Sequence, residues 1–151
     1  MARTSSKPSR GKAGRSGPDR RRGTSSTAHA LQERIKELQC LYGLAQLTER
    51  CEEDLDRLMQ GTAELLVPSW QYPEVTCARV LYQGTEYCSE GFRTSRYVQA
   101  APICLDGERV GAVEVYYTRE MPPADEGPFL SEERALINAV AERLGRTVQW
   151  I

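Results

Sequence analysis

The 151-residue sequence is poor in histidine, has no closely spaced cysteines and lacks any long apolar run. His29 is the only histidine and stands beside a basic tail, which excludes a Ser-His-Asp triad and a Cys/His metal site. The five cysteines are odd in number and form no C-x-x-C motif, so we expect reduced thiols rather than disulfides or a zinc site. No stretch approaches the ~20 apolar residues of a membrane helix. We therefore expect a cytoplasmic protein that does not contact a membrane.

Motifs of catalysis are missing as well. The sequence contains no G-x-S-x-G, no phosphate-binding P-loop and no G-x-G-x-x-G. The acidic pairs Glu52–Glu53 and Glu132–Glu133 stand at predicted helix starts, where the helix dipole favours negative charge. We expect a chain without enzymatic activity and without a cofactor.

Charge divides the chain into a basic tail and an acidic body. Residues 1–28 carry eight basic side chains and one acidic one, whereas the remainder carries 12 basic and 20 acidic ones. Glycine, serine, proline and arginine dominate the tail, so it has too little apolar surface to form a core, and we expect residues 1–28 to be disordered. The tail could neutralise nucleic-acid phosphates, but a solvated tail without such a partner is the favoured interpretation.

Two apolar series with alternating spacings of three and four residues predict a helix over residues 30–50 and its continuation. The first series is Leu31, Ile35, Leu38, Tyr42 and Ala45, and the second is Leu41, Leu44, Thr48, Cys51, Leu55 and Leu58. This alternation is typical of a coiled coil. Residues 29–50 are therefore expected to be a helical linker that forms a homodimer through residues 31–58. A single amphipathic helix packed on its own domain explains the pattern equally well.

The rest of the chain predicts one compact domain over residues 51–149. A second helix is expected over 51–66, strands over 75–82, 85–88, 97–105 and 110–117, and a last helix from Ser131. Gln83–Gly84 and Asp106–Gly107 fit tight hairpin turns between these strands. The fold class is therefore α+β, with an antiparallel sheet of about four strands flanked by N-terminal helices and a C-terminal helix.

Three stretches of this domain resemble a GAF domain, a sensory module found beside histidine kinases and other signalling outputs. They are PSWQYPEVTCAR at 68–79, APICLDGERVGAVEVYY at 101–117 and DEGPFLSEERALI at 125–137. The resemblance covers about residues 35–148 and implies a GAF/PAS-like fold. It further implies a non-catalytic sensory or regulatory module in signal transduction, with a signalling kinase or regulator as partner. The alternative is the truncated sensor portion of a histidine kinase.

Two charged residues stand inside otherwise apolar strands, and the GAF topology would make those strands neighbours. Arg79 and Glu114 are then expected to pair across the sheet, which would explain both charges. In the other interpretation, Arg79 grips an anionic ligand.

A ligand pocket is the last expectation, and the resemblance limits its size. The segment that roofs the pocket in ligand-binding GAF domains is only eight residues long here, 89–96, and the sequence lacks the family's cyclic-nucleotide and bilin-binding signatures. A small or shallow site is still possible. Aromatic side chains could line it, because they combine a large apolar surface with a polar group. The candidates are Trp70, Tyr72, Cys77, Tyr87, Phe92 and Tyr97. Ordinary packing in the core explains the same residues.

Overall fold

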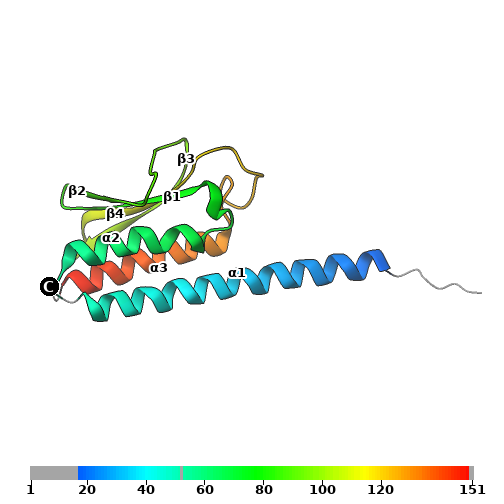
Figure 1. Ribbon diagram of the computed structural model, residues 1–151, viewed down its shortest axis with the longest axis horizontal. Coiled ribbons are helices and arrows are strands. Elements are labelled where there is room, and N and C mark those ends of the chain that lie inside the picture. Colours follow the sequence, from blue (N-terminus) through cyan, green and yellow to red (C-terminus); the bar gives the residue numbers. More distant parts are fainter. Residues whose placement is uncertain (1–16, 52, 150–151) are drawn as a thin grey trace, which may run out of the picture. The chain divides into compact units, whose positions relative to one another are not determined.

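The structure, a computed structural model, describes residues 17–51 and 53–149 (Figure 1). The chain divides into two compact units, with the boundary between Arg34 and Ile35. None of the helices in the described ranges is both long enough and apolar enough to cross a membrane.

Helix α1 (Gly17–Arg50) begins much earlier than the sequence predicted. Residues 17–28 were expected to belong to a disordered tail, and they are helical instead; residues 1–16 lie outside the described residues. Pro18 and Asp19 provide the physical reason for this correction. Proline is well suited to the first turn of a helix, where its missing N–H needs no partner, and an acidic residue there is favoured by the helix dipole.

The second unit begins at Ile35, so it is larger than the predicted domain over residues 51–149. The last part of α1 belongs to it, because Cys40 and Leu44 are each only 1% exposed in the core. Helix α2 (Leu55–Leu66) follows, and it starts four residues later than expected. Asp54 sets this start, since its side chain accepts a hydrogen bond from the backbone N–H of Arg57 at 3.1 Å.

Four antiparallel strands form one sheet in the order β2-β1-β4-β3. Two short 3₁₀ helices, η1 (Val67–Ser69) and η2 (Pro73–Val75), connect α2 to it. The strands are β1 (Thr76–Tyr82), β2 (Thr85–Cys88), β3 (Tyr97–Leu105) and β4 (Glu108–Tyr117), and helix α3 (Ser131–Val148) ends the unit. Both hairpin turns have positive φ angles at their two central residues, 47° and 84° at Gln83–Gly84 and 53° and 81° at Asp106–Gly107. Such angles are those of a type I′ turn, in agreement with the tight hairpin turns that the sequence predicted at both places. The predicted α+β class is confirmed.

Helices α2 and α3 cover one face of the sheet, as Figure 1 shows. Ala78, Val80, Val113 and Val115 point from the central strands into the core between these layers. The last part of α1 packs against α2 on the side away from the sheet. Gly43 and Gly61 allow this close approach, because a Cβ at either position would lie 2.9 Å from a leucine methyl group of the other helix.

Candidate functional site

Arg79 lies at the centre of a charged cluster on the sheet face opposite the helices. It is directly opposite Glu114 in the pairing of β1 with β4. Its Nη2 is 2.6 Å from Glu114 Oε1, and its Nη1 is 2.7 Å from Glu86 Oε1. The guanidinium also lies 5.1 Å from the centre of the Phe92 ring. The partial burial of Arg79 acts to lower its pKa, but the hydrogen bonds to Glu114 and Glu86 outweigh this and raise the pKa above its ordinary value.

This geometry favours a structural role for Arg79 over the binding of an anion. Its Nε, Nη1 and Nη2 atoms all donate to side chains of the same sheet, with Tyr116 Oη as the third acceptor at 3.3 Å. Two carboxylates face one guanidinium, so the local charge is negative. An anionic ligand would have to displace a carboxylate and approach another.

We predict that Arg79 and Glu114 are energetically coupled. In a double-mutant cycle with Arg79→Met and Glu114→Gln, urea unfolding should give a coupling free energy of about 1 kcal/mol, because both side chains are mostly shielded from water. The exposed pair Arg146–Glu142 is the matched control, and its coupling should be only about 0.3 kcal/mol. Equal coupling in the two cycles would contradict the structural role.

The six pocket candidates lie in three separate places rather than in one groove. Trp70 is fully buried, and Tyr72 and Tyr97 are half-buried against the same core. Cys77 and Phe92 lie on the other face of the sheet. There the Cys77 thiol donates to the carbonyl of Arg93 at 3.2 Å, and Phe92 contacts Tyr116 edge-on at 5.5 Å.

Tyr87 is the sixth candidate and joins β2 to α2. Its hydroxyl donates to Asp56 Oδ1 at 2.6 Å. This hydrogen bond, together with partial burial, raises the pKa of Tyr87 to about 12. The side chain is therefore a neutral donor at physiological pH, and it contributes to the packing of α2 on the sheet.

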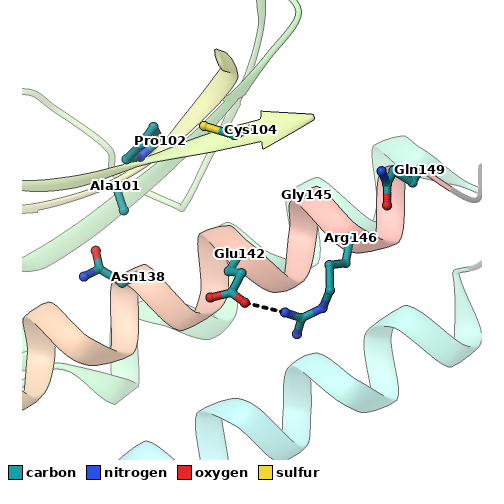
Figure 2. A pocket seen from close by; sticks show the side chains of 8 residues that line it. All are labelled: Ala101, Pro102, Cys104, Asn138, Glu142, Gly145, Arg146 and Gln149. Carbon is teal, nitrogen blue, oxygen red and sulfur yellow. Dashed lines mark hydrogen bonds and ion pairs between the residues drawn. The ribbon is translucent and has the colours of Figure 1, made fainter. Parts of the chain in front are cut away.

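A hollow of about 420 Å³ lies elsewhere, between β3 and α3, and none of the six candidates lines it (Figure 2). Gly145 lies in its wall, where a Cβ would be 2.5 Å from the carbonyl oxygen of Cys104. Glu142 and Arg146 form an ion pair at 2.6 Å, so the charges in the hollow compensate each other. No cluster of three or more histidine, cysteine, aspartate or glutamate side chains in the described ranges could hold a metal ion.

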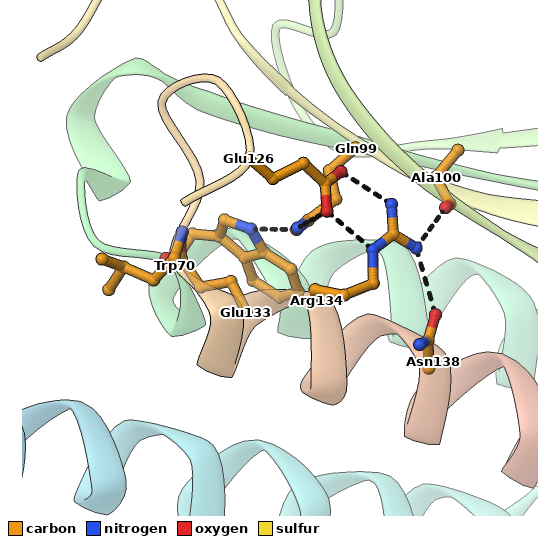
Figure 3. A network of polar contacts seen from close by, with 8 residues as sticks. Trp70, Gln99, Ala100, Glu126, Glu133, Arg134 and Asn138 are labelled. Atoms are coloured by element: carbon orange, nitrogen blue, oxygen red, sulfur yellow. Dashed lines mark hydrogen bonds and ion pairs between the residues drawn. The ribbon is translucent and has the colours of Figure 1, made fainter. Parts of the chain in front are cut away.

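A polar network joins two of the stretches that carry the GAF resemblance (Figure 3). Trp70 Nε1 donates to Gln99 Oε1 at 3.1 Å, and the Gln99 amide points to Glu126. Arg134 holds Glu126 through two hydrogen bonds of 2.8 and 2.7 Å. These bonds keep the pKa of Glu126 below its ordinary value. Buried Glu133 accepts from the backbone N–H of Gln71 at 2.7 Å.

Comparisons of the chain with protein-family models, with curated proteins and with solved structures found no match. The GAF resemblance of the sequence therefore stays a prediction.

The network also protects β3, one of the two edge strands of the sheet. Arg134 Nη1 donates to the backbone carbonyl of Ala100 in β3 at 2.8 Å. Two residues further along β3, Pro102 has no N–H to offer to a further strand. An added strand would thus lack regular partners at the middle of β3, and the edge is a poor site for strand addition.

Sequence reasoning missed Gln99, Glu126, Glu133 and Arg134. The available signal was that the last three stand in the DEGPFLSEERALI stretch, where Glu126 and Arg134 had no assigned role and Glu133 was explained by the helix start alone. In the structure they fix the segment before α3, α3 itself and β3 to the connector after α2. This polar network therefore helps to hold the fold together.

Proposed function

We propose that the chain is a non-catalytic regulatory module of the GAF type that acts through protein contacts, first of all with a second copy of itself. Three kinds of observation support this. The fold class is the one that a GAF domain requires. The quoted stretches contact each other through their polar residues. The aromatic candidates are used in packing, which leaves surface contacts as the means of action.

The single observation that carries the proposal is an exposed apolar stripe on α1. Ile35, Leu38 and Tyr42 are 47%, 58% and 68% exposed. Successive residues of a helix are rotated by about 100°, so this stripe points away from Cys40 and Leu44, which are buried. Leu31, one turn earlier in the sequence, is also exposed. Large apolar side chains that follow one another on a helix mark a protein contact.

The two predicted apolar series lie in different environments. From the second series, Leu44, Thr48, Cys51 and Leu58 are buried in the core of their own chain, so they are not available to a partner. The exposed members of the first series remain, and the proposed dimer contact narrows from residues 31–58 to the stripe of Ile35, Leu38 and Tyr42. Gln32, Gln39 and Gln46 flank it at seven-residue intervals. Their neutral side chains favour close packing of two copies, since charged residues are depleted at the centre of interfaces.

The GAF resemblance supports the downstream part of the proposal. In such proteins the module regulates a signalling output, so a cytoplasmic kinase or another regulator is the proposed further partner. If the module binds a small ligand, the proposed site is a shallow one at the surface. The proposed function requires no cofactor.

The test is the oligomeric state of the full chain, measured by light scattering after gel filtration. We expect a dimer, and we expect Leu38→Glu to weaken dimerisation about 30-fold or more, because a charge would enter the centre of the contact. Val98→Glu is the matched control, because Val98 is 41% exposed on β3, outside the stripe. It should leave the dimer intact. A monomeric wild-type chain at high concentration would refute the proposal.

A further inference from the structure

One corner of the sheet, on the face opposite the helices, carries two exposed arginines beside an exposed apolar residue. We infer that this corner, formed by Arg93, Arg96 and Val98, binds an acidic peptide segment of another protein that also carries an apolar side chain. That protein is the further partner of the proposed function, on which the inference rests. The corner lies outside α1, so its use does not depend on the dimer.

The segment 89–96 connects β2 to β3 across this face and fixes the position of the two arginines. The backbone carbonyl of Arg93 accepts a hydrogen bond from Cys77 Sγ of β1 at 3.2 Å. Ser95 Oγ donates to the carbonyl of Tyr117 in β4 at 2.6 Å. The backbone is therefore anchored at two points beside the arginines. A partner that binds here loses little affinity to the ordering of this segment.

Both arginines are exposed, and neither has an ion-pair partner among the residues that the structure describes. Arg96 lies over the ring of Tyr97, with its guanidinium 5.5 Å from the ring centre, and this contact does not neutralise its charge. Arg79 and Arg134 differ, because carboxylates of their own chain hold them. The guanidinium groups of Arg93 and Arg96 are thus available to carboxylates of another chain.

Val98 supplies an apolar contact two residues after the second arginine. It is 41% exposed, and in the part of the chain that the structure describes it is the only large apolar side chain exposed outside α1. Ala100 and Pro102 are exposed on the same face of β3, where they alternate with residues buried in the core. Arginine is enriched at protein interfaces, and apolar contacts form their centre. The corner therefore has the composition of a small protein contact.

The neighbouring charges determine how an acidic segment would lie on this corner. Glu114 is opposite Ala100 in the pairing of β3 with β4, and it belongs to the negatively charged cluster around Arg79. Carboxylates of a partner would be repelled there. They therefore bind at Arg93 and Arg96, at the start of β3, and the apolar part of the segment lies further along the strand.

The charge of the second unit favours an acidic peptide over a nucleic acid. Residues 35–151 contain 11 basic and 19 acidic side chains. A nucleic acid is a continuous polyanion and would extend from the corner onto an acidic surface, where like charges repel. A short peptide segment with a few carboxylates covers the corner alone. It binds through side chains, because the edge of β3 is a poor site for strand addition.

Selection of random peptides displayed on phage, with the full chain as bait, tests this inference. We expect the enriched peptides to combine acidic residues with an apolar one. A fluorescent synthetic copy of an enriched peptide would then be titrated by anisotropy. The double variant Arg93→Gln, Arg96→Gln should weaken its binding at least about 10-fold, because two charge-assisted contacts are lost. Val98→Glu should weaken it by a similar factor, because it replaces the apolar contact with a repelling charge.

Arg57→Gln is the matched control. Arg57 is an exposed arginine on α2, away from this face of the sheet, and its loss should change the affinity less than about 2-fold. Circular dichroism would confirm that all variants are folded.

The outcomes separate this surface from the dimer. No enrichment, enrichment of peptides without acidic residues, or an unchanged affinity of the double variant would overturn the inference. A single-stranded oligonucleotide that displaces the peptide and requires the same arginines would overturn it in favour of a nucleic acid. A monomeric wild-type chain that binds the peptide would refute the dimer alone, whereas a dimeric chain that binds no peptide would refute this surface alone.

Discussion

Replacing Gly111 with alanine is expected to lower the free energy of unfolding by about 3 kcal/mol or more. A Cβ at this position would collide with the backbone carbonyl of Leu81. Both residues belong to paired strands, because Gly111 lies opposite Tyr82 in the register of β4 with β1. Neither backbone can move away without breaking the ladder between the two central strands. Urea unfolding followed by circular dichroism would measure the loss.

Gly127→Ala is the control for this prediction. Gly127 has a φ angle of 55° and open space where a Cβ would be built. Alanine there should cost only about 1 kcal/mol, the ordinary strain of a left-handed conformation. An equal loss in the two variants would show that the close approach at Gly111 has no energetic weight.

Trp70→Ala should be of similar or larger effect, with a loss of about 3–5 kcal/mol. The Trp70 side chain is fully buried, so its removal leaves a large cavity between the helices and the sheet. It also removes the donor to Gln99, which is itself only 1% exposed and would keep an unsatisfied amide oxygen. Chemical unfolding of the variant would measure the combined effect.

Trp70→Phe separates packing from hydrogen bonding at this site. Phenylalanine retains most of the apolar contact but cannot donate to Gln99, so we expect a loss of about 2 kcal/mol. Exposed Tyr42→Phe is a control for aromatic substitution and should leave the stability of the monomer unchanged. A wild-type stability for Trp70→Phe would mean that the network of Figure 3 does not stabilise the fold.

The strands could be predicted well because their periodicity is strong. The predicted bounds of β2 and β3 match the structure, since polar turn residues stand at both ends of each strand. The helix starts were harder. The start of α2 depends on one hydrogen bond of Asp54, and α1 extends into a segment whose composition resembles a disordered tail.

Within the candidate site, the sequence predicted a contact correctly only where the two residues lie on neighbouring strands. Arg79 and Glu114 stood out as charges within apolar strands, and the structure places them opposite each other. Aromatic residues gave no such guidance, because the sequence does not tell on which face of the sheet Phe92 or Trp70 will lie. The contacts of the polar network join residues up to 62 positions apart, so no local pattern could reveal them.

The two apolar faces of α1 also constrain how this gene can change. Substitutions on a surface helix are generally tolerated, and insertions usually accumulate in loops. One residue inserted between Leu38 and Leu44 would turn the exposed stripe by about 100° relative to the buried side chains. The core contact at Leu44 and the stripe at Ile35 and Leu38 would then no longer be on opposite sides. Homologous chains are therefore expected to differ less in the length of this segment than in its amino-acid sequence.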